Sequence, residues 1–321
     1  MTRLLALILA LALPVAACST DDDQAPQWPE PTLEPPAPGT GFQMALEYTV
    51  QPGEEIWVCN VFPIPIEDPA SVYSVEFEQT PGMHHMTISS TGFDPPEVEY
   101  GLRDCEPIYE ELMDNVVAVF GSQGASHDVM NLPQGVAATL PNNLDIIHEM
   151  HFVNVTDEPV TVFSRVNAYT MDAADVEQGI WGGQVRDENI NIPAGSTHTE
   201  WSRCVFNRDV EVLFLASHTH GLGDQFTVAP FDGTTVGEVF YVNDDLHDPK
   251  IVQYEEPMVI PAGQGFEWTC TWSNPNDFPV TYGLTTADEM CNLAVVHTPF
   301  DPSAQCEVVE TSDGVLWAPE G

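Results

Sequence analysis

Short runs of alternating apolar and polar residues, separated at close intervals by proline and glycine, extend along most of this chain. The 321 residues include 28 prolines and 22 glycines. Alternation with a period of two is typical of β-strands, whereas proline and glycine interrupt long helices. Amphipathic patterns long enough for a helix are scarce, and the clearest, at 107–117, is short. The sequence therefore predicts an all-β protein, with strands at 45–50, 55–59, 74–79, 85–89, 144–153, 160–167, 209–216, 226–230, 238–241, 265–272 and 294–297.

Chain length and one change of pattern indicate two β domains. The region from residue 42 onward is too long for one small sandwich, and a stretch near 170–178 is acidic and lacks strand alternation. We therefore expect an N-terminal β-sandwich at 42–171 and a C-terminal β-sandwich at 175–312. Residues 313–321 would form a tail.

The N-terminus has the pattern of an export signal. An apolar run at 4–13 leads to Val-Ala-Ala-Cys at 15–18, which is typical of a bacterial lipobox. We expect a lipoprotein signal peptide at 1–17 and lipidation of Cys18, which would anchor the protein in the bacterial cell envelope. An ordinary signal peptide followed by an unrelated cysteine is the alternative. The polar, proline-rich residues 18–41 would then form a tether.

Acidic residues greatly outnumber basic ones. The chain has 50 Asp and Glu against 7 Lys and Arg, a net charge of −43, and Lys250 is its one lysine. Such a charge repels phosphate backbones, which excludes nucleic acid as a partner, and it favours a soluble monomer. Adaptation to a salty habitat explains the charge more simply than a cationic substrate does.

Three short segments carry residue types that bind copper. They read Gly-Met-His-His-Met at 82–86, Ser-His-Thr-His-Gly at 217–221 and Asp-Glu-Met-Cys-Asn at 288–292. Imidazole binds copper in both oxidation states, and a thioether favours Cu(I). The segments therefore predict two copper sites, one of which has a methionine ligand and suits oxygen chemistry.

The two histidine pairs have different spacings, and only one of them could bind a metal ion from a regular strand. On a strand, His218 and His220 would project from the same face and could bind one ion. The adjacent pair at 84 and 85 would point apart on a regular strand, so binding one ion needs a bend. Pro81 and Gly82 directly upstream make such an irregularity reasonable.

The order and wording of these segments resemble the copper type II, ascorbate-dependent monooxygenases, the family of peptidylglycine α-hydroxylating monooxygenase and dopamine β-monooxygenase. The resemblance covers most of the chain after the tether. It implies two antiparallel jelly-roll-like β-sandwiches with one copper each, facing across a cleft. It also implies two ligand sets: His84, His85 and His151 for an electron-transfer copper, and His218, His220 and Met290 for the catalytic copper.

The remaining histidines are weaker candidates. His148 and His151 would lie on opposite faces of a strand, so only one can join the first copper set. The family pattern of a histidine followed by an aromatic residue favours His151, with His148 next to the site or at the surface. His127 is expected in a loop, although it could neighbour the first copper. Structural roles are expected for His198, His247 and His297.

Six cysteines remain after Cys18, and an oxidising compartment would pair them. Six cysteines allow fifteen pairings. The resemblance implies one of these, with Cys59–Cys105, Cys204–Cys306 and Cys270–Cys291. Metal binding by some cysteines is the alternative, but the chain has no CxxC spacing.

The resemblance implies an enzyme that hydroxylates a C–H bond of a small organic substrate with O2 and ascorbate or another one-electron reductant. Peptide-amidating members bind a substrate carboxylate with an arginine and a tyrosine where this chain has Ala216 and Ala294, while Asn292 keeps the family residue. We therefore expect these three positions to contact a substrate that is neutral and apolar, or cationic.

Two other functions use the same histidines. A copper-binding lipoprotein for acquisition, delivery or storage would need no turnover. A zinc hydrolase would leave Met290 without a role, because zinc sites take His, Cys, Asp or Glu.

Overall fold

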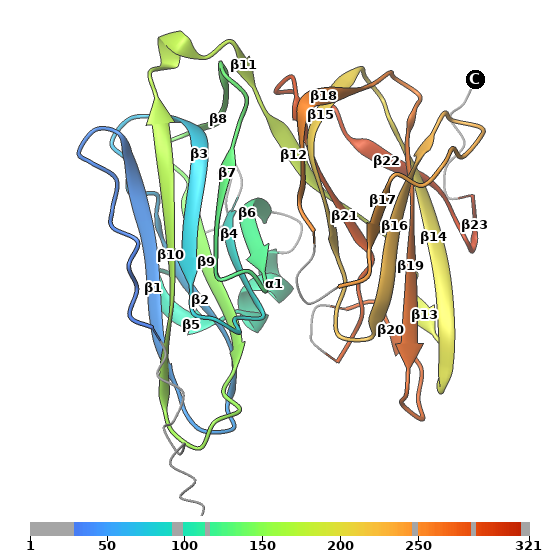
Figure 1. Cartoon of the computed structure of the whole chain (residues 1–321), viewed down its shortest axis with the longest axis horizontal. Helices are drawn as coiled ribbons and strands as arrows, with labels where there is room; N and C mark the ends of the chain where they lie inside the picture. Colours follow the sequence, from blue (N-terminus) through green and yellow to red (C-terminus); the bar gives the residue numbers. More distant parts are fainter. Residues whose placement is uncertain (1–28, 92–98, 113–115, 246–249, 284–286, 316–321) are drawn as a thin grey trace, which may run out of the picture.

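The computed structural model describes residues 29–91, 99–112, 116–245, 250–283 and 287–315. Strands dominate these residues, which confirms the all-β prediction, and they form two groups of sheets that lie side by side (Figure 1). No helix in this part of the chain is long and apolar enough to cross a membrane. The predicted signal peptide, Cys18 and His247 lie outside the described residues.

The first half of the chain forms two sheets. One has the strand order β1 (Gly41–Val50), β10 (Val160–Met171), β3 (Ala70–Gln79), β8 (Val136–Leu140) and β11 (Gln178–Gly179), with β7 (His127–Asn131) also paired to β3. The other has the order β5 (Gly101–Asp104), β2 (Glu55–Pro63), β9 (Asp145–Val153), β4 (His85–Ser90) and β6 (Val117–Gln123).

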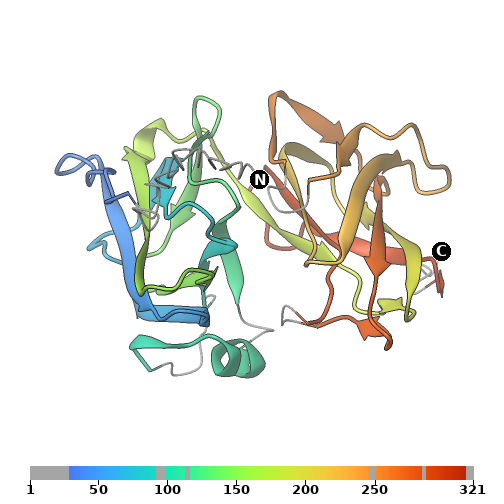
Figure 2. The ribbon, with the colours of Figure 1, turned by 60° about the horizontal axis from the view of Figure 1, so that its bottom comes forward.

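Strand β9 shows how the sequence positions side chains on two faces. Ile146 and Met150 are buried in apolar clusters that also contain residues of β1, β3 or β10, so they face the other sheet. Ile147 belongs to a different cluster, with residues of the short helix α1 (Glu106–Leu112). This helix packs on the outer side of the second sheet, and the Cys59–Cys105 disulfide joins its start to β2 (Figure 2).

The second half also forms two principal sheets. One has the order β12 (Trp181–Arg186), β21 (Asn292–Thr298), β15 (Val210–His218) and β18 (Val252–Ile260). The other has the order β17 (Tyr241–Asn243), β16 (Gly223–Phe231), β19 (Gly265–Asn274), β14 (Ser196–Phe206), β22 (Cys306–Thr311) and β23 (Gly314–Val315). A small third sheet pairs β13 (Asn191–Ile192) with β20 (Val280–Thr281).

Large apolar side chains fill the space between the two principal sheets of this half. Trp268 and Trp272 of β19 are fully buried there with Leu293 of β21. The disulfides Cys204–Cys306 and Cys270–Cys291 lie in the same cluster. All three disulfides of the structure are the pairs that the resemblance implied.

The two halves meet through a short connection and an apolar contact. The chain leaves β10, passes a 3₁₀ turn, η2 (Ala173–Asp175), and pairs β11 with β8 before β12 enters the second half. Val136 packs with Leu213 and Phe214, and Ile180 covers this contact. The acidic segment near 170–178 thus lies between β10 of the first half and β12 of the second.

Several boundaries differ from the expected ones. The described helix spans Glu106–Leu112, against an expected 107–117, and the strand expected at 238–241 begins only at Tyr241. β23 lies within the expected tail. The expected tether is also shorter: the backbone N–H groups of Thr32 and Leu33 donate to the carboxylate of Glu78 on β3, so this segment lies on the first sheet.

Candidate metal centres

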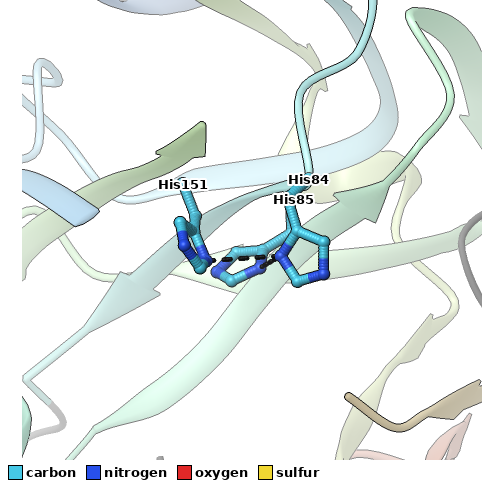
Figure 3. Close-up of side chains that lie close together, drawn as sticks. All are labelled: His84, His85 and His151. Atoms are coloured by element: carbon cyan, nitrogen blue, oxygen red, sulfur yellow. Dashed lines mark hydrogen bonds between the residues drawn. The ribbon is translucent and has the colours of Figure 1, made fainter. Parts of the chain in front are cut away.

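Three imidazoles converge at one end of β4 and β9. Nδ1 of His84 lies 3.0 Å from Nδ1 of His85 and 3.3 Å from Nδ1 of His151 (Figure 3). One nitrogen from each ring lies within 4.8 Å of the others. These are the three histidines that the sequence assigned to the first copper.

A tight turn explains how two adjacent histidines reach one point. Met83 N–H donates to the carbonyl of Thr80, and Gly82 between them has a positive φ of 81°. Proline followed by a glycine with positive φ is the signature of a type II turn. His84 lies just before β4, where its N–H donates to the carbonyl of His151, whereas His85 is already the register partner of His151 within the sheet. The bend that the sequence required is therefore present.

Two carboxylates determine which ring nitrogens remain for a metal. Nε2–H of His85 donates to Oε1 of Glu149 over 2.7 Å, and Nε2–H of His151 donates to Oε1 of Glu55 over 2.8 Å. A carboxylate on the outer nitrogen selects the tautomer and fixes the plane of the ring. Both rings are thus left with Nδ1 as the ligand atom, on the side where the three nitrogens meet.

Glu149 is itself held by two aromatic donors. The indole N–H of Trp57 donates to it over 2.5 Å, and the hydroxyl of Tyr109 on α1 also donates to it. The two rings are stacked with centroids 5.4 Å apart. Burial raises the pKa of Glu149, but His85 and the aromatic donors outweigh that effect, so its pKa is lowered and the group stays ionised.

The second candidate set lies at the end of β15 and in the loop before β21. The rings of His218 and His220 have centroids 5.3 Å apart and are nearly perpendicular. Nδ1–H of His220 donates to the backbone carbonyl of Asp288 over 3.0 Å, which leaves Nε2 for a metal. The residue that binds His220 is two positions before Met290, so the imidazole and the methionine loop are attached to each other.

A buried carboxylate organises the methionine loop. Glu289 accepts hydrogen bonds from the backbone N–H groups of His220, Leu222 and Met290 and from the indole of Trp272. Burial raises the pKa of Glu289, and these four donors oppose the rise. The Cys270–Cys291 disulfide ties the next residue to β19. Main-chain atoms on both sides of Met290 are therefore fixed.

The spacing of the rings fits metal coordination. Nitrogen donors about 2 Å from one ion at tetrahedral angles lie about 3.3 Å apart, with the ring centroids about 5 Å apart. The first set has nitrogens at 3.0 and 3.3 Å and centroids at 4.9 to 5.1 Å. The pair at 218 and 220 has a similar centroid spacing. With a neutral sulfur nearby, the second set has the donor chemistry of a Cu(I) site.

One cleft connects the two sets. It has a volume of about 1200 Å³ and lies between the halves, with His85 on one side and His218, His220 and Met290 on the other. Burial holds the pKa of His218 well below its usual value, and a charge on His220, His85 or His84 acts in the same direction. The two sets therefore lie within electrostatic range of each other.

The other histidines lie away from these sets. His148 is fully buried on the opposite face of β9 from His151, where Nε2 contacts the Ser164 hydroxyl at 2.9 Å, so the prediction of a surface or neighbouring role was wrong. Its place in the sandwich core follows from strand alternation. His127 lies on β7, not in a loop, and its ring contacts Glu76 at 3.1 Å. His198 bonds to Glu200 and His297 to the carbonyl of Ala304.

Only two of the three positions expected to contact substrate line the cleft. Ala216 and Ala294 are register partners on β15 and β21, and both line the cleft. Asn292 is buried and is not among the lining residues. Its Nδ2 lies 3.2 Å from the sulfur of Met290 and donates to Oε1 of Gln184 over 3.1 Å. Asn292 therefore supports the methionine in this structure.

Sequence reasoning missed the carboxylates that hold the candidate ligands. Glu149 lies two residues before His151, and side chains two apart on a strand share a face, so this signal was available. Glu289 stands directly before Met290, but three of its four donors, on His220, Leu222 and Trp272, come from distant segments of the chain. Glu55 faces His151 only because β2 pairs with β9, and no local pattern predicts it.

One comparison with known proteins covers the part of the chain that contains the second set. Residues 182–317 match the family model described as the C-terminal domain of copper type II ascorbate-dependent monooxygenases. The comparison with curated proteins returned no match. Among solved structures, infectious bursal disease virus Gx strain is 12% identical, with 85% of this chain and 75% of that chain covered and a TM-score of 0.15. The Gt strain is 12% identical, with 88% and 77% covered and a TM-score of 0.14. Both TM-scores are too low to indicate a shared fold.

Proposed function

Residues 182–317 of this chain carry the C-terminal domain of the copper type II ascorbate-dependent monooxygenase family, and from this premise we propose that the protein is a dicopper monooxygenase. It hydroxylates a C–H bond of an organic substrate with O2 and an electron donor such as ascorbate. Each half is a jelly-roll-like β-sandwich with one copper site. The protein is a monomer, anchored through lipid on Cys18 in a bacterial cell envelope.

One observation carries the proposal: two donor sets of different softness reach the same cleft, which is lined by His85 of the first set and by His218, His220 and Met290 of the second. Three imidazoles form one set, and two imidazoles with a thioether belong to the other. Imidazoles alone stabilise either oxidation state, and the thioether favours the reduced one. A pair of such sites suits chemistry in which electrons are stored at one centre and used at the other.

In this proposal the two ligand sets have different roles. His84, His85 and His151 would hold the electron-transfer copper, and His218, His220 and Met290 the catalytic copper. Bound copper would supply O2 binding and one-electron transfer. The protein keeps the imidazoles in the binding tautomer through Glu149, Glu55 and the carbonyl of Asp288. The cleft holds the substrate beside Met290.

A copper-binding lipoprotein without turnover is the second candidate, because it would use the same ligands. The shared cleft favours the enzyme, since a store or carrier needs no common space between two sites. A zinc hydrolase is disfavoured for a different reason: the loop around Met290 is fixed by a disulfide and a buried carboxylate, and zinc sites have no use for a thioether.

Metal stoichiometry tests the proposal first. Copper per chain is measured after loading and removal of excess metal, in the parent protein and in Met290→Ile and His84→Ala variants. We expect two coppers in the parent and one firmly bound copper in each variant. Met258→Ile is the matched control, because Met258 is not among the residues that line the cleft, and it should retain both.

Oxygen consumption then separates the enzyme from the carrier. With reductant present, the parent should consume O2 faster when a hydroxylated substrate is added, and Met290→Ile should lose this increase. One copper in the parent, or copper binding indifferent to Met290, would contradict the two-site enzyme.

A further inference from the structure

Basic side chains are scarce in this protein, and their positions are uneven. Six of the seven lie in the described part of the chain. Four of these form contacts of 3.4 Å or less with carboxylates away from the cleft lining; these are Arg103, Arg165, Arg203 and Arg208. The other two, Arg186 and Lys250, both line the cleft between the halves.

Arg186 stands beside the methionine-containing site. It is the register partner of Asn292 on β21, which is in turn the register partner of His218 on β15. Neighbouring strands are about 4.8 Å apart, so the backbones of Arg186 and His218 are separated by about 10 Å. Its Nη1 donates to the hydroxyl of Tyr282, the residue after β20, over 3.4 Å.

The guanidinium of Arg186 is largely uncommitted. An arginine has five N–H donors, and within the described segments the Tyr282 contact is its one hydrogen bond. Its nearest carboxylate, Glu188, lies 3.7 Å away and is 63% exposed. A contact of this kind contributes little. The side chain of Arg186 can therefore turn its planar edge to a ligand in the cleft.

Lys250 lies on the other side of the same site. Its carbonyl accepts a hydrogen bond from the hydroxyl of Tyr241 over 2.7 Å, and this hydroxyl is also 2.9 Å from the hydroxyl of Ser217, the neighbour of His218. Lys250 has no ion pair with any residue of the described ranges. Arg186 and Lys250 thus line the same cleft as His218.

Most of the strand surface that lines the cleft between these two positions is apolar. Gln184, Ala294 and Ala216 form one row across β12, β21 and β15, and all three line the cleft. Phe214 and Val296 continue the lining on the same strands. The volume of about 1200 Å³ exceeds the 300 to 1,000 Å³, roughly, of ordinary ligand pockets. A molecule with an extended apolar body fits this surface.

The carboxylates of the cleft do not cancel these cations. Glu149 is occupied by His85 and two aromatic donors. Asp128 lies on β7 in the other half and, among the described residues, accepts no hydrogen bond from either cation; Glu307 lies on β22. Glu307 pairs with the residue before Phe206, and the ring of Phe206 packs on His297. Because His297 is the register partner of Trp181, Glu307 lies near the opposite end of β12 from Arg186.

We propose that Arg186, assisted by Lys250, binds the carboxylate of an organic monoanion whose apolar body lies over Ala216 and Ala294 beside His218. This inference rests on the proposed function, whose substrate it defines more closely. A planar guanidinium binds a carboxylate through two hydrogen bonds. A single negative charge is favoured because the net charge of −43 repels more highly charged anions. A cationic substrate, in contrast, would meet two like charges at the site.

The test uses three probes with the same apolar body and different end groups: 4-phenylbutanoate, 4-phenylbutanamide and 4-phenylbutylamine. Binding to the copper-loaded full chain is measured by calorimetry. The acid should bind at least tenfold more tightly than the amide or the amine. Arg186→Gln should weaken the acid about 10- to 100-fold, as expected for loss of a charge-assisted pair, and change amide binding less than twofold.

Two control variants make the result specific. Arg186→Lys keeps the positive charge but cannot donate two parallel hydrogen bonds to a carboxylate. It should therefore retain part of the preference for the acid over the amide that Arg186→Gln loses. Arg103→Gln removes the same charge from a surface pair with Glu99 and should leave all three affinities unchanged. Equal binding of acid and amide, tighter binding of the amine, or an acid preference that survives in Arg186→Gln would overturn the proposal.

Two further measurements distinguish this proposal from a binding site for the reductant and from the monooxygenase proposal itself. Ascorbate is also a monoanion, so anaerobic reduction of the copper by ascorbate is followed in the same variants. If Arg186→Gln slows reduction but leaves acid binding unchanged, the anion is the reductant and the proposal fails. Acid binding that depends on Arg186 without acid-dependent O2 uptake would support the anion site and count against the monooxygenase. Substrate-coupled O2 uptake without any preference for the acid would support the monooxygenase and count against the anion site.

Discussion

Nε2 of His85 lies 2.7 Å from Oε1 of Glu149, so a buried carboxylate is joined directly to one of the three converging imidazoles. The same carboxylate accepts hydrogen bonds from Trp57 and Tyr109. It therefore links the candidate copper site to the helix that covers the sheet. Its negative charge is available to stabilise the more positive oxidation state of a metal at this site.

Replacement of Glu149 by Gln should change the first copper site selectively. Loss of the charge should weaken Cu(II) binding about 10- to 100-fold, as for other residues that hold ligating histidines, and should raise the reduction potential. Chelator competition and an electron paramagnetic resonance redox titration measure the two effects. Glu55→Gln should act in the same direction but more weakly, because Glu55 is half exposed. An unchanged potential in Glu149→Gln would contradict this role.

The disulfides should support different copper sites. Cys270→Ser/Cys291→Ser removes a bond that closes 21 residues, which stabilises by about 3 kcal/mol on a loop-entropy estimate. Because it frees the residue next to Met290, the second copper should be bound at least tenfold more weakly. Cys59→Ser/Cys105→Ser frees α1 and its Tyr109, so it should affect the first copper instead. Copper titration of both variants below their unfolding temperatures tests this, and the opposite assignment would refute it.

Copper binding at the second site should change little in mildly acidic solution. The pKa values of His218 and His220 are lowered, chiefly by burial, so both rings remain able to bind at lower pH than ordinary imidazoles. Two imidazoles with ordinary pKa values near 6.5 would lose about tenfold or more in affinity from pH 8 to 6. We expect less than about threefold in a His84→Ala background, measured by chelator competition. A tenfold loss would show that the rings titrate normally.

His148 should make the protein sensitive to acid. Burial lowers its pKa to about 3, below the value of about 6.5 in an unfolded chain. The unfolded chain therefore binds more protons between these values, and stability falls as the pH drops below 6.5. From pH 7 to 5 this group accounts for about 2 kcal/mol of the loss.

Denaturant unfolding of a His148→Gln variant at both pH values measures this contribution. The variant should lose about 2 kcal/mol less than the parent between pH 7 and 5, because glutamine does not titrate. His127→Gln, which changes an exposed histidine paired with Glu76, is the control and should behave like the parent. Equal losses in all three proteins would mean that His148 is not held neutral.

Local pattern was sufficient for some features and insufficient for others. The alternation in 144–153 correctly indicated β9, and it also separated His148 from His151, because alternate residues face opposite sides of a strand. The turn at Pro81 and Gly82 could be anticipated in the same way. Strands such as β12 and β22 were not predicted, since their residues are selected by neighbouring strands and not by a strong pattern of their own.

The sequence by itself determined the all-β class and the kinds of donor atoms that the chain can offer, because strand periodicity and ligand chemistry are properties of short segments. Tertiary structure decided which donors meet. His85 and His151 are 66 residues apart and converge only through the register of β4 with β9. The same holds for Arg186 and Lys250, whose common position in one cleft follows from the pairing of β12, β21, β15 and β18, since Lys250 lies just before β18. Register between distant strands depends on core packing over whole sheets, and no short segment of the chain contains that information.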